Sequence, residues 1–510
     1  MSSRTDFAGF DAVLRGLRLF ENPRIACLTL AGLLASAVLP LVTLPPLDMD
    51  IWWIAAAGRR ISETGRVPST NLFSFTEPNH PWIMHEWLYG VIFDRGTAWF
   101  GPAFFSLFGL LSACATSAVV LLSTVGRAKH APSAALLAAF VLLGVMGHID
   151  SPRPLHASAL FAVGMAALAF APRFGLAQLL LCVTLEVVWV NAHGSFPLGV
   201  ALLAAGAWAA RADHLQRGAA AIVCGVGTFA NPYGARIFLI VLQYAHPTDP
   251  AFALIHESLG GFMPLWKAPP MFVDAGTLFA CASVAALAGA CVVTRSERRR
   301  AAVALVLLLL GALHVRHLVL GVLVSTVLAA PALDALFLRW GGEAPSARER
   351  SVRTLLAVVP AVVVGLCAFA SKARASSQEE WIPVPLGGAA FVRLARTLPF
   401  DARVHAPFGS SGLLLWAAAD SRRVRVLYDA RNDCYSAELI AAGLAFDQAK
   451  RPGTELQGLL EHYGADHAIL EERSVLAKTL LRSERWLVRR HEGRWIVFEQ
   501  ARAFQRATPG

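Results

Sequence analysis

The chain has 510 residues, of which 56% are hydrophobic and only 16% are charged, and its mean hydropathy is +0.53. This composition excludes an ordinary soluble globular protein and predicts a protein that crosses a membrane many times. The net charge of +10 would suit a nucleic-acid partner. Because the basic residues before residue 371 are concentrated on one predicted side of the membrane, we expect no such partner.

Apolar runs near the length of a membrane-spanning helix, about 20 residues, recur along the first 370 residues. The first run follows three arginines and is long enough to span, so we expect an uncleaved helix rather than a signal peptide. The predicted spans are 25–44, 101–125, 131–148, 155–171, 174–190, 195–210, 218–230, 272–293, 301–313, 317–337 and 354–370.

The basic residues orient these spans. Seventeen Lys and Arg residues before residue 371 fall in segments on the side of the N-terminus, and eight fall on the other side. Cytoplasmic loops carry the excess of positive charge, so the N-terminus is predicted to be cytoplasmic. We therefore expect a multi-pass protein of the inner (cytoplasmic) membrane whose C-terminal domain is periplasmic or extracellular.

Residues 45–94 form a long, acidic and aromatic outward loop between the first two runs. A connector needs only a few residues, so a loop of this length indicates a function. The pattern predicts an amphipathic helix over 50–64 that lies at the membrane interface, and a second one over 84–93. Tryptophans such as Trp52 and Trp53 are either part of a site or interfacial anchors, and both interpretations stay open.

Residues 371–510 contain 20 Lys and Arg residues and are predicted to form a soluble, mixed α/β domain. The fold class is thus an α-helical polytopic membrane protein, with a transmembrane domain over 1–370 followed by this outer domain. Within the outer domain we expect strands at 423–428 and 467–470, helices at 435–449 and 454–463, and a hairpin of 486–490 with 495–499.

Acids and histidines gather at the outward ends of the first four spans. Charges at the edge of a bilayer are costly unless they pair or face water, so they are candidates for function. An acid here can serve as a general base towards an acceptor hydroxyl, while a second carboxylate orients the acceptor or holds a divalent cation. The candidate catalytic residues are Asp48, Asp50, His85, Glu86 and Asp150.

Some alternatives stay open for these acids. Asp48 can instead be a simple helix cap, and the choice between Asp48 and Asp50 as the base is undecided. No metal ligands are assigned, although a divalent cation is possible. Glu186 lies inside the fifth span, where it is neutral, paired with a cation, or part of a cavity wall.

Cations and histidines near the same surface suit a phosphate or diphosphate leaving group. Arg316, placed between two histidines at membrane depth, fits a lipid phosphate; the alternative is an interfacial arginine that snorkels towards water. The candidate donor-phosphate residues are Arg153, His193, Arg316 and His317.

The motifs in these loops resemble bacterial membrane proteins of the GT-C glycosyltransferase superfamily. They are Asp48-Met-Asp50-Ile-Trp52-Trp53, Pro81-Trp-Ile-Met-His85-Glu86-Trp87, Asn191-Ala-His193-Gly194, Asn231-Pro-Tyr-Gly234, Arg316-His317 and Tyr428-Asp-Ala-Arg431. The resemblance implies inverting transfer of a sugar from a polyprenyl-phosphate donor to a glycan, lipid or protein acceptor on the outer face.

In that superfamily an acid of the first outward loop binds or deprotonates the acceptor, and a second acid lies in the next outward loop. Asp50 and Asp150 match these positions, although the first loop has Asp-x-Asp instead of an adjacent acidic pair. Metal dependence varies in the family. Two other classes remain: a lipid or solute transporter, and a non-catalytic scaffold for envelope assembly.

Overall fold

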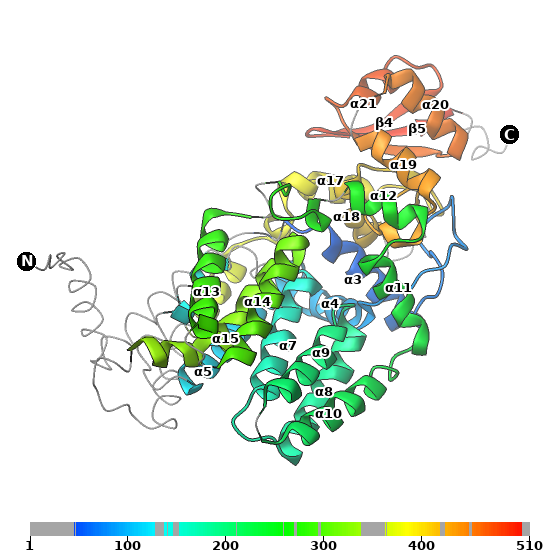
Figure 1. Cartoon of the computed structure of the whole chain (residues 1–510). Helices are drawn as coiled ribbons and strands as arrows, with labels where there is room; N and C mark the ends of the chain where they lie inside the picture. Colours follow the sequence, from blue (N-terminus) through cyan, green and yellow to red (C-terminus); the bar gives the residue numbers. More distant parts are fainter. Residues whose placement is uncertain are drawn as a thin grey trace, which may run out of the picture.

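The computed structural model describes most of the chain and places a helical region beside a smaller domain with a sheet (Figure 1). The predicted span 25–44, and most of 131–148 and 354–370, lie outside the described residues. The described residues are 45, 47–127, 137–139, 141–145, 152–210, 212–258, 260–269, 273–293, 297–337, 363, 365–418, 424–447 and 451–501.

The other eight predicted spans are helices in the structure, and they pack against one another as a bundle (Figure 1). Among the described residues, one helical stretch, Ala103–Gly126, is by itself long and apolar enough to cross a membrane, and several of the others are shorter apolar helices. The eight are α5 Ala103–Arg127, α7 Pro154–Ala169, α8 Leu176–Ala192, α9 Pro197–Ala209, α10 His214–Gly227, α13 Ala275–Val293, α14 Arg298–Leu313 and α15 Leu318–Phe337.

The predicted helix of the first loop is confirmed as α3, Asp50–Thr64. It ends because Gly65 adopts a left-handed backbone (φ 66°), from which its N–H reaches Ile61 O at 2.8 Å. Protein covers this helix, in contrast to the exposed amphipathic helix that the sequence suggested: every residue from 51 to 58 is buried, and Trp52 is fully enclosed. The next helix, α4 Trp87–Phe100, begins later and runs further than predicted.

Helix α3 is held between two other helices at points where their backbones touch. A Cβ atom on Gly58 would lie 1.8 Å from Gly90 O of α4, so α3 and α4 cross in direct backbone contact. On the other side, a Cβ atom on Gly412 of α18 (Phe408–Ala418) would lie 2.7 Å from Met49 O. Helix α3 is therefore packed between α4 and the C-terminal domain.

Short helices form the second outward loop and the turn between α14 and α15. They are η1 Gly234–Arg236, α11 Ile237–Ala245, α12 Pro250–Ser258, η2 Gly260–Phe262 and η4 Val315–His317. The two that Figure 1 labels, α11 and α12, lie beside α3 at the end of the bundle that is nearest to the C-terminal domain.

The C-terminal domain has one five-stranded sheet in the order β2-β1-β3-β5-β4. Strand β1 is parallel to β2 and β3, whereas β5 is antiparallel to β3 and β4. The strands are β1 Arg403–His405, β2 Arg425–Val426, β3 His467–Glu471, β4 Trp486–Glu492 and β5 Trp495–Gln500, and the helices are η6 Gln378–Trp381, η7 Val384–Leu386, α17 Gly388–Ala395, α18, η8 Asn432–Cys434, α19 Ala437–Asp447, α20 Gly453–Tyr463 and α21 Val475–Leu480.

The mixed α/β prediction is confirmed in its main elements. The hairpin, β3, α19 and α20 lie where the sequence placed them, and the strand expected over 423–428 is reduced to β2. Strand β1 was missed because three residues are too few to show an alternating pattern.

The first loop extends this sheet beyond β2. Val426 N–H donates to Phe73 O (2.8 Å), and Phe75 N–H donates to Val426 O (3.2 Å). The Thr76 hydroxyl donates to Leu427 O at 2.9 Å. Residues 73–76 thus cover a sheet edge that would otherwise expose unpaired backbone groups.

A fully buried arginine, Arg431, joins the C-terminal domain to the first loop. Arg431 Nη2 lies 2.7 Å from Asp429 Oδ2 and donates to Asn71 Oδ1 at 2.8 Å. Its guanidinium carbon lies 4.9 Å from the ring centre of Phe73 and 4.7 Å from that of Trp82. The first loop therefore supplies both the aromatic walls and a hydrogen-bond acceptor for a cation of the C-terminal domain.

Candidate active site

Two aspartates meet one arginine at the start of α3. Arg153, which directly precedes α7, places Nε 2.6 Å from Asp48 Oδ2 and Nη2 2.8 Å from Asp50 Oδ2. Asp48 Oδ1 also accepts the Asp50 backbone N–H at 2.8 Å. The residue at the cap of α3 is Met49, so Asp48 supports the first helical N–H from one position before the cap. Asp50 accepts a further bond from the Trp53 indole at 3.2 Å.

The surroundings of Asp50 favour a basic carboxylate. Burial raises the pKa of Asp50 above its ordinary value, the charge of Arg153 opposes this rise, and the charge of Asp48 adds to it. A carboxylate with a raised pKa takes up a proton more readily, which is what a general base requires.

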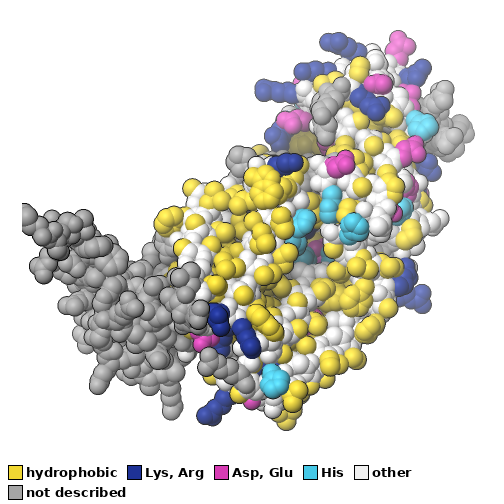
Figure 2. Space-filling model, in the orientation of Figure 1, with side chains coloured by type: hydrophobic (Ala, Val, Ile, Leu, Met, Phe, Trp, Pro, Cys, Tyr) yellow, Lys and Arg dark blue, Asp and Glu magenta, His cyan; other side chains and the backbone are white. Residues whose placement is uncertain are grey.

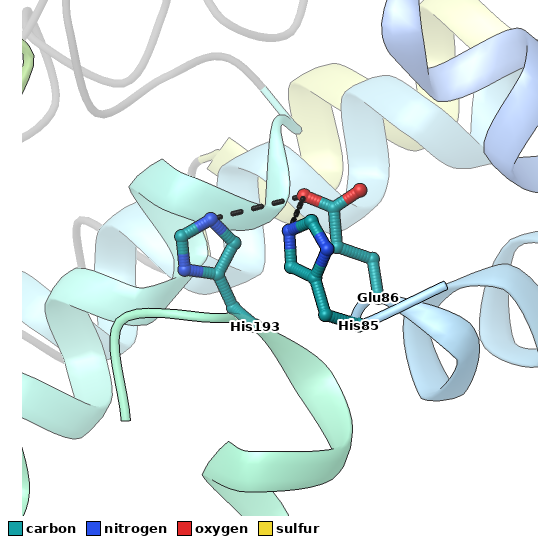
Figure 3. A group of neighbouring side chains, drawn as sticks. All are labelled: His85, Glu86 and His193. Carbon is teal, nitrogen blue, oxygen red and sulfur yellow. Dashed lines mark ion pairs between the residues drawn. The ribbon is translucent and has the colours of Figure 1, made fainter. Parts of the chain in front are cut away.

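The Glu86 carboxylate lies between two imidazoles (Figure 3). Glu86 Oε1 is 3.6 Å from His85 Nε2 and 3.7 Å from His193 Nε2. His85 and Glu86 directly precede α4, and His193 directly follows α8, so two separate loops form this group. A Cβ atom on Gly194 would lie 3.1 Å from the His85 ring, which makes the contact between these loops close.

The three donor atoms of His85, Glu86 and His193 lie within 4.8 Å of one another, which is close enough for a metal ion. The hydrogen bonds of His193 argue against that use. The Ser195 backbone N–H donates to His193 Nδ1 at 3.1 Å, and the Ser195 hydroxyl lies 2.8 Å from the same nitrogen. Because Nδ1 accepts, the proton of the neutral ring is assigned to Nε2, the atom that faces Glu86.

Burial also sets the charge of this group. It raises the pKa of Glu86 to about 8, with a further contribution from the negative charge of Asp50. Burial lowers the pKa of both His85 and His193, so that these rings are neutral near pH 7. The group is therefore a largely protonated carboxyl between two neutral imidazoles, near the two aspartates at the start of α3.

Arg316 lies in η4 on an aromatic surface. Its guanidinium carbon is 4.4 Å from the ring centre of Phe262 and 5.7 Å from that of Tyr244, whose ring is 6.2 Å from His85. Within the described ranges, no ion pair or hydrogen bond engages this guanidinium. In contrast to Arg153, Arg316 keeps its five donors for a ligand.

Two of the sequence motifs hold the loops in place. Asn191 Oδ1 accepts from the Trp87 indole at 3.0 Å, which joins the end of α8 to the start of α4. The Tyr233 hydroxyl accepts the Met84 N–H at 2.9 Å and donates to Pro68 O at 2.6 Å. These bonds fix the first loop on both sides of the His85-Glu86 pair.

The structure brings together most of the predicted site residues, and in the surface view histidines gather around a hollow between the apolar bundle and the C-terminal domain (Figure 2). His317 is exposed, and it also lies near this group, because its charge acts on His193. Asp150 lies outside the described residues. The residues that lie near one another are Asp48, Asp50, His85, Glu86, Arg153, His193 and Arg316.

Sequence reasoning missed Asp433 and Tyr244. Asp433 comes from η8 of the C-terminal domain, and its charge acts on His85, Glu86 and Tyr244. Neither residue belongs to a recognisable local pattern, because each reaches the group only through tertiary packing.

Glu186 of α8 stands apart from this group. It is fully buried, and within the described residues neither carboxylate oxygen has a hydrogen-bond partner. A Cβ atom on Gly199 of α9 would lie 2.0 Å from Glu186 Oε2, so the carboxyl rests directly on a neighbouring helix backbone. Of the three alternatives drawn from the sequence, these surroundings favour the neutral acid.

Comparison with solved structures identifies the fold. ArnT from Cupriavidus metallidurans in the apo state matches with a TM-score of 0.54 at 13% identity, covering 92% of this chain and 97% of that chain. The structure of the same protein bound to undecaprenyl phosphate matches with a TM-score of 0.51 at 14% identity. The match covers 93% of this chain and 97% of that chain. The archaeal oligosaccharyltransferase AglB from Archaeoglobus fulgidus matches with a TM-score of 0.50 at 11% identity, in a complex with an inhibitory peptide and a dolichol-phosphate. The match covers 87% of this chain and 69% of that chain.

Both neighbours are membrane glycosyltransferases of the GT-C superfamily, so the fold that the motifs predicted is confirmed. At these identities the likeness concerns the fold. No protein-family model matches the chain, and no curated protein matches it.

Proposed function

We propose that this chain, which has the GT-C fold, is an inverting glycosyltransferase that moves a sugar from a polyprenyl-phosphate donor to an acceptor on the outer face of the cytoplasmic membrane. The observation that supports the proposal is that a carboxylate able to act as a base and a guanidinium able to bind a phosphate lie near each other. A half-buried carboxylate with a raised pKa, Asp50, lies near the Arg316 guanidinium, with which no residue in the described ranges forms a hydrogen bond or an ion pair.

Asp50 and Arg316 each act in the transfer reaction. Asp50 accepts the proton of the acceptor hydroxyl while the acceptor oxygen attacks the anomeric carbon of the sugar. The bond between that carbon and the phosphate oxygen breaks, and the lipid phosphate leaves with the bonding electrons. Arg316 donates hydrogen bonds to the departing phosphate.

Asp50 is preferred to Asp48 as the base because of their hydrogen bonds. Asp48 is committed to the first turn of α3 through the Asp50 N–H and to Arg153 through a 2.6 Å contact. Arg153 therefore positions the two acids, whereas Arg316 receives the donor. His85, Glu86 and His193 shape the pocket, and the same role is proposed for Asp150.

A groove beside Glu86 suits the lipid part of the donor. It has a volume of about 530 Å³ and opens next to Trp87, the residue that follows Glu86. An isoprenoid chain needs an apolar surface that continues into the bilayer. The lining residues are Trp87, Leu88, Val187, Val188, Asn191, Phe229, Ala230, Asn231 and Pro232.

Replacement of Arg316 tests the donor site directly. An Arg316→Gln variant is expected to bind undecaprenyl phosphate roughly tenfold more weakly or worse, because charge-assisted hydrogen bonds to the phosphate are lost. Native mass spectrometry of the purified protein measures this binding. Lys267→Gln, which removes an exposed cation of the second outward loop, is the matched control and should bind normally. Equal binding by Arg316→Gln would remove Arg316 from the donor site.

The pH dependence of transfer reports on Glu86. We expect transfer by the unmodified protein to fall as the pH rises through about 8, since ionised Glu86 adds a negative charge beside Asp50 and the donor phosphate. A Glu86→Gln variant stays neutral and should lack this alkaline decline. Rates measured from pH 6 to about 9.5 decide the point. An identical decline in both proteins would assign it to another group.

A further inference from the structure

The turn η8 belongs to the C-terminal domain but is fastened to the first loop on both sides. Before it, Arg431 donates to Asn71 Oδ1. Within it, Cys434 O accepts from Asn71 Nδ2 at 3.0 Å, and after it the Ser436 N–H donates to Glu77 Oε2 at 2.8 Å. The position of the residue between them, Asp433, is therefore fixed relative to the first loop.

Asp433 lies near enough to the group around Glu86 for its charge to act on His85 and Glu86. The charge of Arg431 acts on Asp433 in turn, and the charge of Asp433 also acts on Tyr233 and Tyr244. Asp433 is half-buried. Burial raises its pKa to about 6, so it is still mainly a carboxylate near pH 7.

In the part of the chain that the structure describes, the Asp433 carboxylate accepts a hydrogen bond only from its own backbone N–H. Across the described ranges, no other residue gives the Asp433 side chain a hydrogen bond or an ion pair. The neighbouring Arg431 directs its guanidinium to Asp429 and Asn71. Water exclusion around a carboxylate is costly unless hydrogen-bond donors replace the water, and a ligand can supply them.

We propose that Asp433 binds the acceptor and accepts a hydrogen bond from a hydroxyl or ammonium group of that molecule. This inference rests on the proposed function. Arg316 binds the phosphate of the donor, and the acceptor enters from the C-terminal domain, between Asp433 and the base Asp50. The C-terminal domain thus takes part in choosing the acceptor.

The test separates use of the acceptor from use of the donor. The donor is a lipid-linked sugar fraction extracted from cells grown on radiolabelled glucose, and it is added to the purified protein. In the first assay water is the acceptor, and hydrolysis of the donor is measured. Transfer is measured in parallel with a dilution series of envelope extract from cells that lack this protein. The Asp433→Ala variant should need about tenfold more extract for half-maximal transfer, with donor hydrolysis and undecaprenyl phosphate binding within about twofold of normal.

A second substitution identifies the acceptor group. Asparagine keeps an oxygen that accepts a hydrogen bond, so an Asp433→Asn variant that transfers well, beside a defective Asp433→Ala variant, points to a hydroxyl. Loss in both points to an ammonium group, which needs the charge. Glu438→Gln, an exposed acid of α19, is the matched control and should leave every rate unchanged.

Three results overturn the inference. Unchanged half-saturation by Asp433→Ala would show that Asp433 does not contact the acceptor. An equal loss of donor hydrolysis and transfer would give Asp433 a role other than acceptor binding. If the unmodified protein neither hydrolyses nor transfers, the proposed function fails and the inference fails with it.

Discussion

An Asp50→Asn variant is expected to transfer sugar about 10²–10⁴-fold more slowly than the unmodified protein, at saturating donor and acceptor. Asparagine has nearly the same shape as aspartate and can still accept from the Trp53 indole, but it cannot take the proton of an acceptor hydroxyl. The binding of undecaprenyl phosphate should be retained, since Arg316 is untouched. Radiolabelled transfer in proteoliposomes measures the rate.

The matched control is Asp94→Asn, which makes the same change at a buried acid of the first-loop region. Asp94 accepts from the Ser62 hydroxyl at 2.7 Å and lies 3.5 Å from Arg59, so it holds α4 to α3. We expect a transfer rate close to normal. Normal transfer by Asp50→Asn would reject Asp50 as the base, and a large loss in Asp48→Asn alone would move the role to Asp48.

Replacing Arg431 by methionine should destabilise the protein by about 3–5 kcal/mol, the usual cost of leaving one partner of a buried ion pair uncompensated. Both side chains of the Arg431–Asp429 pair are inaccessible to solvent. The variant would leave the Asp429 carboxylate inside the protein without its cation. It would also remove the group packed against Phe73 and Trp82.

Thermal unfolding monitored by intrinsic tryptophan fluorescence measures this effect, and limited proteolysis shows whether the C-terminal domain separates from the first loop. Arg393→Met removes an exposed cation that lies between Glu379 and Glu492, and it should leave the unfolding temperature nearly unchanged. A stable Arg431→Met variant would mean that the two regions are joined mainly by their backbone contacts.

Helix α3 shows both what the sequence predicted and what it could not. Its ends were predicted correctly, because an acid at the start and a glycine at the end are local signals. The burial of α3 was not predicted, because charged residues near the end of a helix also occur in helices that lie on a membrane surface. The covering helix α18 comes from a region more than 300 residues later in the chain.

Some residues of the candidate site could be predicted from the sequence, and others could not. His85, Glu86 and His193 were predicted because each lies in a motif at the end of a predicted span, and spans that end on one side bring their ends to one depth. Asp433 had no such signal: it is a single acid in a polar domain, and Asn71 and Glu77 determine its position. Periodicity and charge cannot predict a contact between residues so distant in the chain.

The sheet edge formed by residues 73–76 has a consequence for biosynthesis. Thr76 and its partner Leu427 are 351 residues apart. At ordinary rates of elongation the loop waits roughly 20–70 s for the strand that it must join. During that interval its aromatic side chains and backbone groups are exposed to chaperones and proteases, so a truncated chain that stops before β2 should be degraded rather than accumulate.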